Sequence, residues 1–123
     1  MENNKKSAII GFHEKSLLDM FSMYSEEFGY KVDLANNFEE MLQKCKENDY
    51  NIYLMDLNLG KKGSPDINPA IIIYRMIEPK VKEGKAKFMG LSGRYDVVES
   101  AIKERIPADD KISFVDKLKS FLE

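Results

Sequence analysis

Short apolar runs alternate along the chain with longer segments in which apolar residues recur every three or four positions. The short runs are mostly rich in β-branched and aromatic residues, which predicts strands that are buried on both faces of a sheet. They occupy residues 7–12, 30–34, 51–55, 87–91 and 106–109. The longer segments have helical periodicity and predict amphipathic helices. They occupy residues 16–28, 37–45, 69–78, 96–103 and 113–122.

Polar residues and helix breakers set the expected helix ends. In a capping pair, a short polar side chain binds the N–H groups of the first helical turn and an acidic residue follows three positions later. Three such pairs are Ser16 with Asp19, Asn37 with Glu40, and Ser113 with Asp116. Asn68 followed by Pro69 predicts the start of the third helix, Gly29 the end of the first, and Pro79 the end of the third.

Strict alternation of strands and helices indicates one fold class. Consecutive strands joined by helices require crossover connections, so we expect a doubly wound, five-stranded parallel sheet with helices on both faces, a three-layer α/β/α arrangement. The chain shows no repeat or interdomain linker, so residues 1–123 are expected to form a single domain with a flexible N-terminal tail over residues 1–6.

The composition is that of a soluble globular protein, with 43% apolar and 33% charged residues. A net charge of −2 without a basic stripe argues against direct nucleic-acid binding. No apolar stretch is long enough to cross a membrane and the N-terminus lacks a secretory signal, so a cytoplasmic location without membrane contact is expected. The single cysteine, Cys45, lies on the apolar side of its predicted helix and is interpreted as a small buried hydrophobe.

Three chemically useful side chains follow the ends of three predicted strands. They are the carboxylate of Asp56, the hydroxyl of Ser92 and the ammonium of Lys111. Each alone fits a simpler interpretation, as a turn residue or a solvated surface charge. Because ligands of open α/β sheets bind beyond the carboxyl ends of the strands, we expect the three side chains to converge at that edge.

This arrangement resembles the receiver domain of two-component response regulators. The resemblance spans residues 7–122 and is strongest at Leu54-Met55-Asp56-Leu57-Asn58-Leu59. It implies a flavodoxin-like fold with strand order 2-1-3-4-5. It also implies that Asp56 accepts a phosphoryl group from a histidine kinase or phosphotransfer protein, forming an aspartyl phosphate. Phosphorylation would signal to a downstream protein effector by protein contact, as part of a phosphorelay.

The resemblance also assigns the neighbours of the acceptor. Ser92 and Lys111 match the residues that bind the phosphoryl group, and Arg94 flanks the site. Mg²⁺ would be held by Asp56 and by the backbone carbonyl of Asn58. The chain would be no enzyme beyond self-catalysed phosphoryl transfer and autodephosphorylation.

The match fails where receivers carry an adjacent pair of acidic metal ligands. Phe12 and His13 stand there, so Mg²⁺ binding is expected to be weakened, and Glu14 is the nearest replacement carboxylate. Imidazole suits transition metals better than Mg²⁺. His13 therefore has three interpretations: a transition-metal ligand, a neutral or cationic group beside Asp56, or a partly exposed residue without a chemical role.

Further departures affect signalling. Ala108 replaces the usual aromatic switch residue, Ile112 replaces the proline that usually follows the lysine, and Asp109 and Asp110 are candidate competitors for the Lys111 ammonium. The extended loop over residues 60–68 is interpreted as a partner surface, a flap over Asp56 or a disordered excursion.

These departures leave an alternative function open. The chain is either a phosphoryl-accepting receiver or an atypical pseudo-receiver that binds proteins without phosphorylation. A third function, an aspartate-dependent phosphohydrolase, is disfavoured because Asn58 stands where that chemistry needs a general acid.

Overall fold

The computed structural model describes residues 6–61 and 63–123, which form a five-stranded parallel sheet with order β2-β1-β3-β4-β5. The predicted fold class and strand order are confirmed. The strands are β1 Ser7–Gly11, β2 Lys31–Ala35, β3 Ile52–Asp56, β4 Lys87–Ser92 and β5 Ala108–Asp110. The helices are α1 Lys15–Glu27, α2 Phe38–Glu47, α3 Asn68–Lys82, α4 Tyr95–Lys103 and α5 Leu118–Leu122, the last preceded by the 3₁₀ helix η1 Ser113–Lys117.

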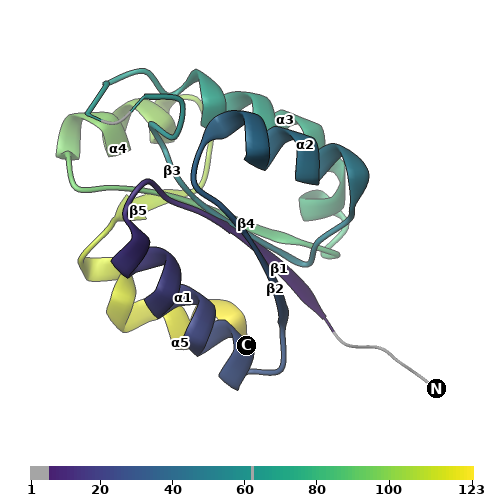
Figure 1. Ribbon diagram of the computed structural model, residues 1–123. Coiled ribbons are helices and arrows are strands. Elements are labelled where there is room, and N and C mark those ends of the chain that lie inside the picture. The colour runs from purple at the N-terminus through teal and green to yellow at the C-terminus, as the bar shows by residue number, and fades with distance from the viewer. Residues whose placement is uncertain (1–5, 62) are drawn as a thin grey trace.

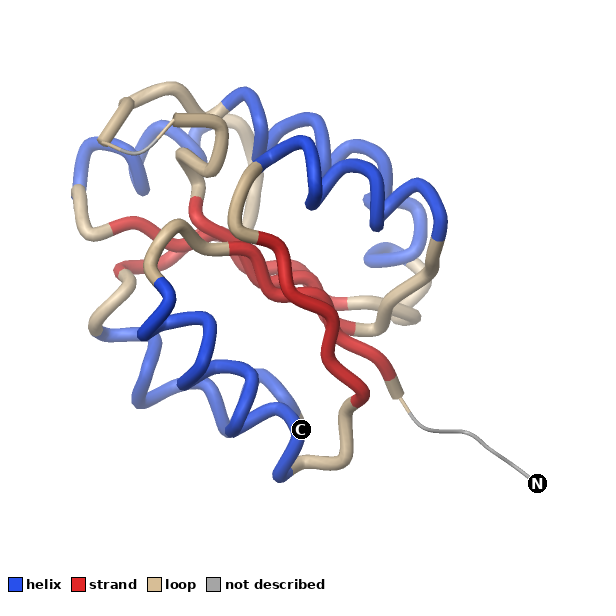
Figure 2. The backbone as a smooth tube through the Cα atoms, in the orientation of Figure 1, coloured by secondary structure: helices blue, strands red, loops and turns tan. Residues whose placement is uncertain are grey.

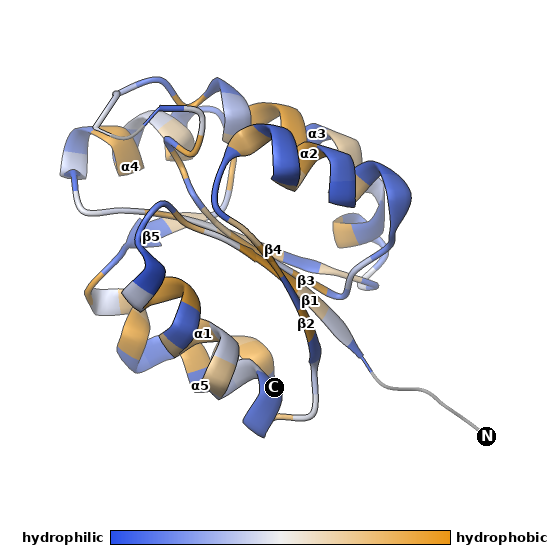
Figure 3. Cartoon of the chain, viewed as in Figure 1, coloured by the Kyte–Doolittle hydropathy of each residue, from blue (hydrophilic) through white to orange (hydrophobic). Residues whose placement is uncertain are grey.

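The sheet is covered by helices on both faces. Helices α2, α3 and α4 lie on one face and α1 and α5 on the other (Figure 1), and the tube view separates the three layers (Figure 2). Each helix turns its apolar side toward the strands and its hydrophilic side outward (Figure 3). Two buried apolar clusters result, one on each face. All five residues of the central strand β3 are buried, which fixes the strand that ends in Asp56.

The capping pair predicted for α2 is present, whereas the one predicted for α1 is wrong. Asn37 Oδ1 accepts the Glu40 N–H at 2.8 Å, as expected of an N-cap. Helix α1 instead begins at Lys15, so Ser16 lies inside it, and no side chain caps it. The Asp19 carboxylate is bound by the Lys15 ammonium at 2.9 Å, an i,i+4 pair that removes it from any capping role.

Helix α3 differs from its prediction at both ends. It begins at Asn68, so Asn68 is not the N-cap; the Asp66 carboxylate accepts the Asn68 N–H at 2.9 Å instead. It also continues through Pro79 to Lys82. Pro79 removes one helical hydrogen bond. The next residue, Lys80, connects the last turn of α3 to strand β3. The Lys80 ammonium donates to the Tyr53 hydroxyl at 2.7 Å, a tertiary contact that the local pattern does not reveal.

The C-terminal elements are shifted from their predicted positions. Strand β5 starts at Ala108 and not at residue 106, because Pro107 has no N–H to donate to a neighbouring strand. Ser113 does not cap the last helical segment with its side chain, and the first turn is 3₁₀. The cap comes from Asp110, whose Oδ2 accepts the N–H groups of residues 112 and 113 at 3.1 and 2.9 Å.

Three further predictions concern the N-terminal segment, the cysteine and the length of the apolar helices. Most of the N-terminal tail lies outside the described residues, but the Lys6 carbonyl accepts the Lys31 N–H at 2.7 Å, so residue 6 is tied to the sheet and not a free tail. Cys45 is buried, as predicted. Across residues 6–61 and 63–123, no helix is both long and apolar enough to cross a membrane.

Candidate functional site

The structure brings the three strand-end side chains together. Asp56 ends β3, Ser92 ends β4, and Lys111 follows β5 directly. The Lys111 N–H donates to the Ser92 carbonyl at 3.0 Å, which fixes the chain between β5 and η1 beside β4. All three residues line one cavity of about 230 Å³ at the carboxyl edge of the sheet, together with His13, Glu14, Asn58, Gly63, Gly93 and Arg94. The predicted convergence is therefore present.

Asp56 is a buried carboxylate held by two neighbours. Its side chain is 1% exposed. Oδ2 accepts the backbone N–H of His13 at 3.0 Å, which joins the end of β3 to the β1–α1 loop. Oδ1 lies 2.8 Å from the Lys111 ammonium. That contact is an ion pair, and Oδ1 has no other polar partner among the described residues.

Lys111 is shared by two carboxylates. Its ammonium also lies 2.9 Å from Oε1 of Glu14, and it stands over the Phe12 ring, 5.9 Å from the ring centroid. Burial alone would lower the pKa of Lys111, but its contacts with Asp56 and Glu14 outweigh that effect and raise it. The ammonium form is therefore stabilised where it faces the Asp56 carboxylate.

The predicted competitors of Lys111 are wrong. The Asp109 carboxylate is paired with the Lys117 ammonium at 2.8 Å, and the Asp110 carboxylate caps the following turn. Glu14 is the acidic residue that competes with Asp56 for Lys111. Sequence reasoning named Glu14 only as a metal-binding arm, because the contact joins residues 97 positions apart.

Phe12 and His13 occupy the place of the acidic pair in different ways. Phe12 is fully buried and stacks on Phe21 with ring centroids 5.1 Å apart, so it belongs to the core beneath Lys111. His13 is half-buried, and its Nε2 lies 3.1 Å from the Asn58 carbonyl oxygen. Since a carbonyl oxygen only accepts hydrogen bonds, Nε2 carries the proton in this contact. A protonated ring nitrogen does not coordinate a metal, so the interpretation of His13 as a transition-metal ligand is disfavoured at Nε2.

The side chains present at this edge do not fit Mg²⁺. The ion requires several oxygen ligands in near-octahedral geometry. Here the Asn58 carbonyl accepts the His13 ring, Phe12 offers no oxygen, and the Glu14 carboxylate is held by Lys111. Within the described ranges, no group of three or more His, Cys, Asp or Glu side chains is placed to hold a metal ion.

Ser92 and Arg94 close the side of the cavity formed by β4 and α4. The buried Ser92 Oγ accepts the Arg94 N–H at 3.0 Å. The Arg94 guanidinium is anchored to the Asp96 carboxylate at 2.9 Å and reaches the Gly63 carbonyl at 3.4 Å. The contact with Gly63 places the loop over residues 60–68 at the border of the Asp56 cavity. Its interpretations as a partner surface, a flap over Asp56 or a disordered excursion stay predictions, and Lys62 lies outside the described residues. Gly63 and Gly93 were not predicted as site residues, because a glycine in a turn-rich segment gives no chemical signal.

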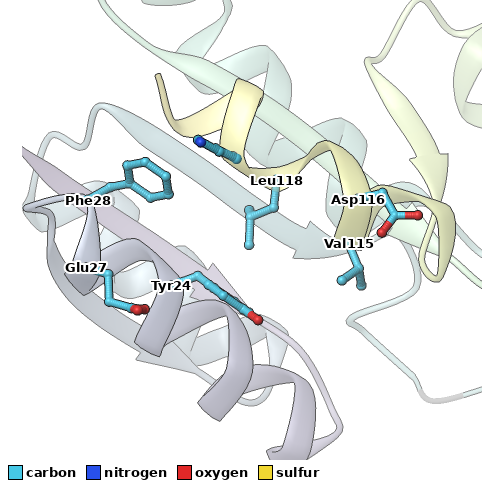
Figure 4. A pocket seen from close by; sticks show the side chains of 7 residues that line it. Tyr24, Glu27, Phe28, Val115, Asp116 and Leu118 are labelled. Atoms are coloured by element: carbon cyan, nitrogen blue, oxygen red, sulfur yellow. The ribbon is translucent and has the colours of Figure 1, made fainter.

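A larger cavity of about 440 Å³ lies between α1 and the η1–α5 segment (Figure 4). Its walls are the side chains of Tyr24, Glu27, Phe28, Val115, Asp116, Leu118 and Lys119. Figure 4 shows Leu118 and Val115 facing the last turns of α1 across this space. None of the strand-end residues lines it, so the chemistry is placed at the smaller cavity.

Comparison with known proteins supports the fold assignment. No protein-family model matches the chain, and no curated protein matches its sequence. Among solved structures, the chain is similar to a CheY-like receiver domain from Methanospirillum hungatei, with a TM-score of 0.71 and 18% identity over 95% of this chain and 93% of that one. The chain therefore has the fold of response-regulator receiver domains.

Two other similar structures contain ligands. A response regulator from Burkholderia pseudomallei, with a TM-score of 0.72 and 18% identity over 96% of this chain, carries a phosphorylated aspartic acid, a calcium ion and citrate. The present chain spans 66% of the length of that protein. The regulator TrrA from Thermotoga maritima, in complex with Mg²⁺ and BeF, matches with a TM-score of 0.65 and 21% identity over 92% of this chain and 98% of that one.

Proposed function

We propose that this protein is a response-regulator receiver that accepts a phosphoryl group on Asp56 and signals by protein contact. The observation that carries the proposal is the buried Asp56 carboxylate, whose Oδ1 lies 2.8 Å from the Lys111 ammonium in a cavity that Ser92 also lines. A carboxylate acts as a nucleophile toward phosphorus when adjacent positive charge stabilises the transferred group. The phosphoryl donors would be a histidine kinase or a phosphotransfer protein, and the output a downstream protein effector.

The chain's own residues supply the parts of this reaction. Asp56 Oδ1 contacts only the Lys111 ammonium among the described residues, which leaves an electron pair to attack phosphorus. The Lys111 ammonium has three N–H groups, of which Asp56 and Glu14 engage at most two, leaving one for a phosphoryl oxygen. In its contact with Arg94, Ser92 Oγ is the acceptor, so the hydroxyl hydrogen is not used there. No other described residue accepts that hydrogen. That hydrogen is available to a second phosphoryl oxygen.

One observation favours a second function, that of a pseudo-receiver. The His13 ring holds the Asn58 carbonyl and Phe12 is part of the core, so this edge of the sheet lacks two oxygen ligands that a divalent cation would use. A chain that had lost phosphorylation would keep the fold and signal by binding alone. The competing functions differ in whether Asp56 becomes phosphorylated.

The test is incubation of the full chain with acetyl phosphate, alone and with Mg²⁺, followed by intact mass measurement. Addition of one phosphoryl group to the native chain, and none to the Asp56→Asn variant, is the expected result. Asp66→Asn is the matched control, because it removes a carboxylate from the exposed loop next to the site. An unmodified native chain under every condition would refute phosphorylation and support the pseudo-receiver.

A further inference from the structure

The Asn58 carbonyl, just past the end of β3, has a side-chain partner from the β1–α1 loop. It accepts the His13 Nε2–H at 3.1 Å, while the backbone N–H of the same residue donates to Asp56 Oδ2 at 3.0 Å. His13 thus binds both the acceptor carboxylate and the carbonyl two residues beyond it. These two contacts join the β1–α1 loop to the end of β3.

Positive charge at the acceptor comes from the protein. The Lys111 ammonium lies 2.8 Å from Asp56 Oδ1 and is only 18% exposed, so water screens this charge less than it would a surface lysine. The Glu14 carboxylate, which is 42% exposed, opposes it by binding the same ammonium at 2.9 Å. An incoming phosphoryl group competes with Glu14 for Lys111, because the Glu14 side chain is partly exposed and can bind water instead.

We infer that Asp56 accepts a phosphoryl group without a divalent cation, because His13 holds the Asn58 carbonyl and Lys111 provides the positive charge at the acceptor. This inference rests on the proposed function and specifies how the same site works. With acetyl phosphate as donor, one Asp56 carboxylate oxygen forms a bond to phosphorus. The bond from phosphorus to the acetate oxygen breaks, and acetate leaves with the electron pair. No oxidant or reductant takes part, and no proton has to move.

The first test compares the rate of phosphorylation by acetyl phosphate in EDTA with the rate in millimolar Mg²⁺. An ion that stabilised the transition state would change the rate by about a hundredfold or more. We expect the two rates to agree within about twofold, the range in which an ion acts only by screening charge. Labelling that appears only with Mg²⁺ would overturn this inference and leave the proposed function intact. An Asp56 that is labelled in neither condition would refute the proposed function, and this inference with it.

A second test asks directly whether the site binds an ion, using Mn²⁺ as the probe and electron paramagnetic resonance to count free Mn²⁺. The native chain is expected to bind none at millimolar Mn²⁺, whereas His13→Asp replaces the ring by an oxygen ligand beside the Asn58 carbonyl and is expected to bind it. Ser16→Asp, which adds the same charge at an exposed position three residues on, is the control and is expected not to bind. Binding by the native chain, or none by His13→Asp, would contradict the role of His13.

A third test concerns Glu14. Removing its charge in Glu14→Gln frees Lys111, so the rate in EDTA is expected to rise about two- to fivefold, the range for a partly exposed ion pair. Glu26→Gln removes the same charge from an exposed position of α1 and serves as the control. If Glu14 instead served as a metal ligand, Glu14→Gln would leave the rate in EDTA unchanged and lower the rate in Mg²⁺, and the inference would be wrong.

Discussion

The imidazole of His13 donates a hydrogen bond to the carbonyl oxygen of Asn58 across 3.1 Å, joining two loops that are 45 residues apart in the chain. The contact holds the His13 ring in the cavity that Asp56 also lines. The interpretation of His13 as a neutral or cationic group beside Asp56 stays a prediction. The contact also ties the β1–α1 loop to the segment that follows β3. Asp56 itself is buried between the β1–α1 loop and Lys111. The contribution of the Asp56–Lys111 ion pair to the stability of the protein can be measured.

Lys111→Met should destabilise the protein at neutral pH. The substitution keeps the apolar stem but leaves Asp56, 1% exposed, without its ammonium partner. We expect a loss of about 1–3 kcal/mol, less than for a fully buried pair because Lys111 keeps some contact with water. Chemical denaturation of the variant and the native chain measures the loss, with Lys61→Met as an exposed control. Equal stability of the native chain and Lys111→Met would show that the ion pair contributes nothing.

The same pair predicts a pH dependence. The folded state raises the pKa of Lys111 above its ordinary value of 10.5, so the ammonium binds its proton more tightly in the folded chain than in the unfolded one. Its stabilising contribution is therefore complete below pH 10.5 and is lost as the pH rises through the raised pKa. The stability difference between the native chain and Lys111→Met should shrink over that alkaline range. A difference that stays constant or grows there would contradict the assignment.

Gly90→Ala should destabilise the sheet next to the site. A methyl group on Gly90 would overlap the side chain of Leu57, whose Cγ would lie only 3.0 Å away, and Leu57 is fully buried. Overpacking of this kind costs about 1–3 kcal/mol. Gly93→Ala, where a methyl group meets no atom within 4 Å, should change stability by less than about 0.5 kcal/mol. Thermal or chemical unfolding of the two variants tests the contrast, and similar losses in both would refute it.

Cys45 should be nearly inert toward alkylating reagents in the folded protein. Burial raises the pKa of its thiol to about 12, with a smaller opposing effect from the charge of Lys80. Only the thiolate reacts with such reagents. Because the pKa is raised to about 12, almost no thiolate is present at pH 8. Mass spectrometry after iodoacetamide treatment is expected to show slow labelling of the native chain and rapid labelling in urea. Equally fast labelling in both conditions would mean that the thiol is exposed.

Much of the fold was predictable from hydrophobic periodicity, because buried strands and amphipathic helices leave distinct patterns. The convergence of Asp56, Ser92 and Lys111 followed from the parallel topology. The strand order was predictable only through the resemblance to receiver domains. Helix ends were less predictable because the polar side chains had other partners in the fold. Asp19 binds Lys15 and does not cap α1, and α3 continues past Pro79 with Lys80 bound to Tyr53.

Within the site, residue positions were predictable but their partners were not. Sequence reasoning placed His13 and Glu14 near Asp56, yet it gave no means of knowing that one would bind the Asn58 carbonyl and the other Lys111. Both contacts depend on side-chain conformations across loops that are far apart in the chain. The competing acids proposed beside Lys111 were wrong for a different reason. Asp109 and Asp110 bind groups that lie close to them in the chain, the Lys117 ammonium and the backbone N–H of residue 113.

The central claim, that Asp56 is the phosphoacceptor, is tested most directly by chemical trapping. An aspartyl phosphate is an acyl phosphate, and borohydride reduces it to homoserine, which marks the modified position permanently. After treatment of the native chain with acetyl phosphate and then borohydride, peptide sequencing by mass spectrometry should find homoserine at position 56. Unaltered aspartate at position 56, or homoserine at another aspartate, would contradict the account.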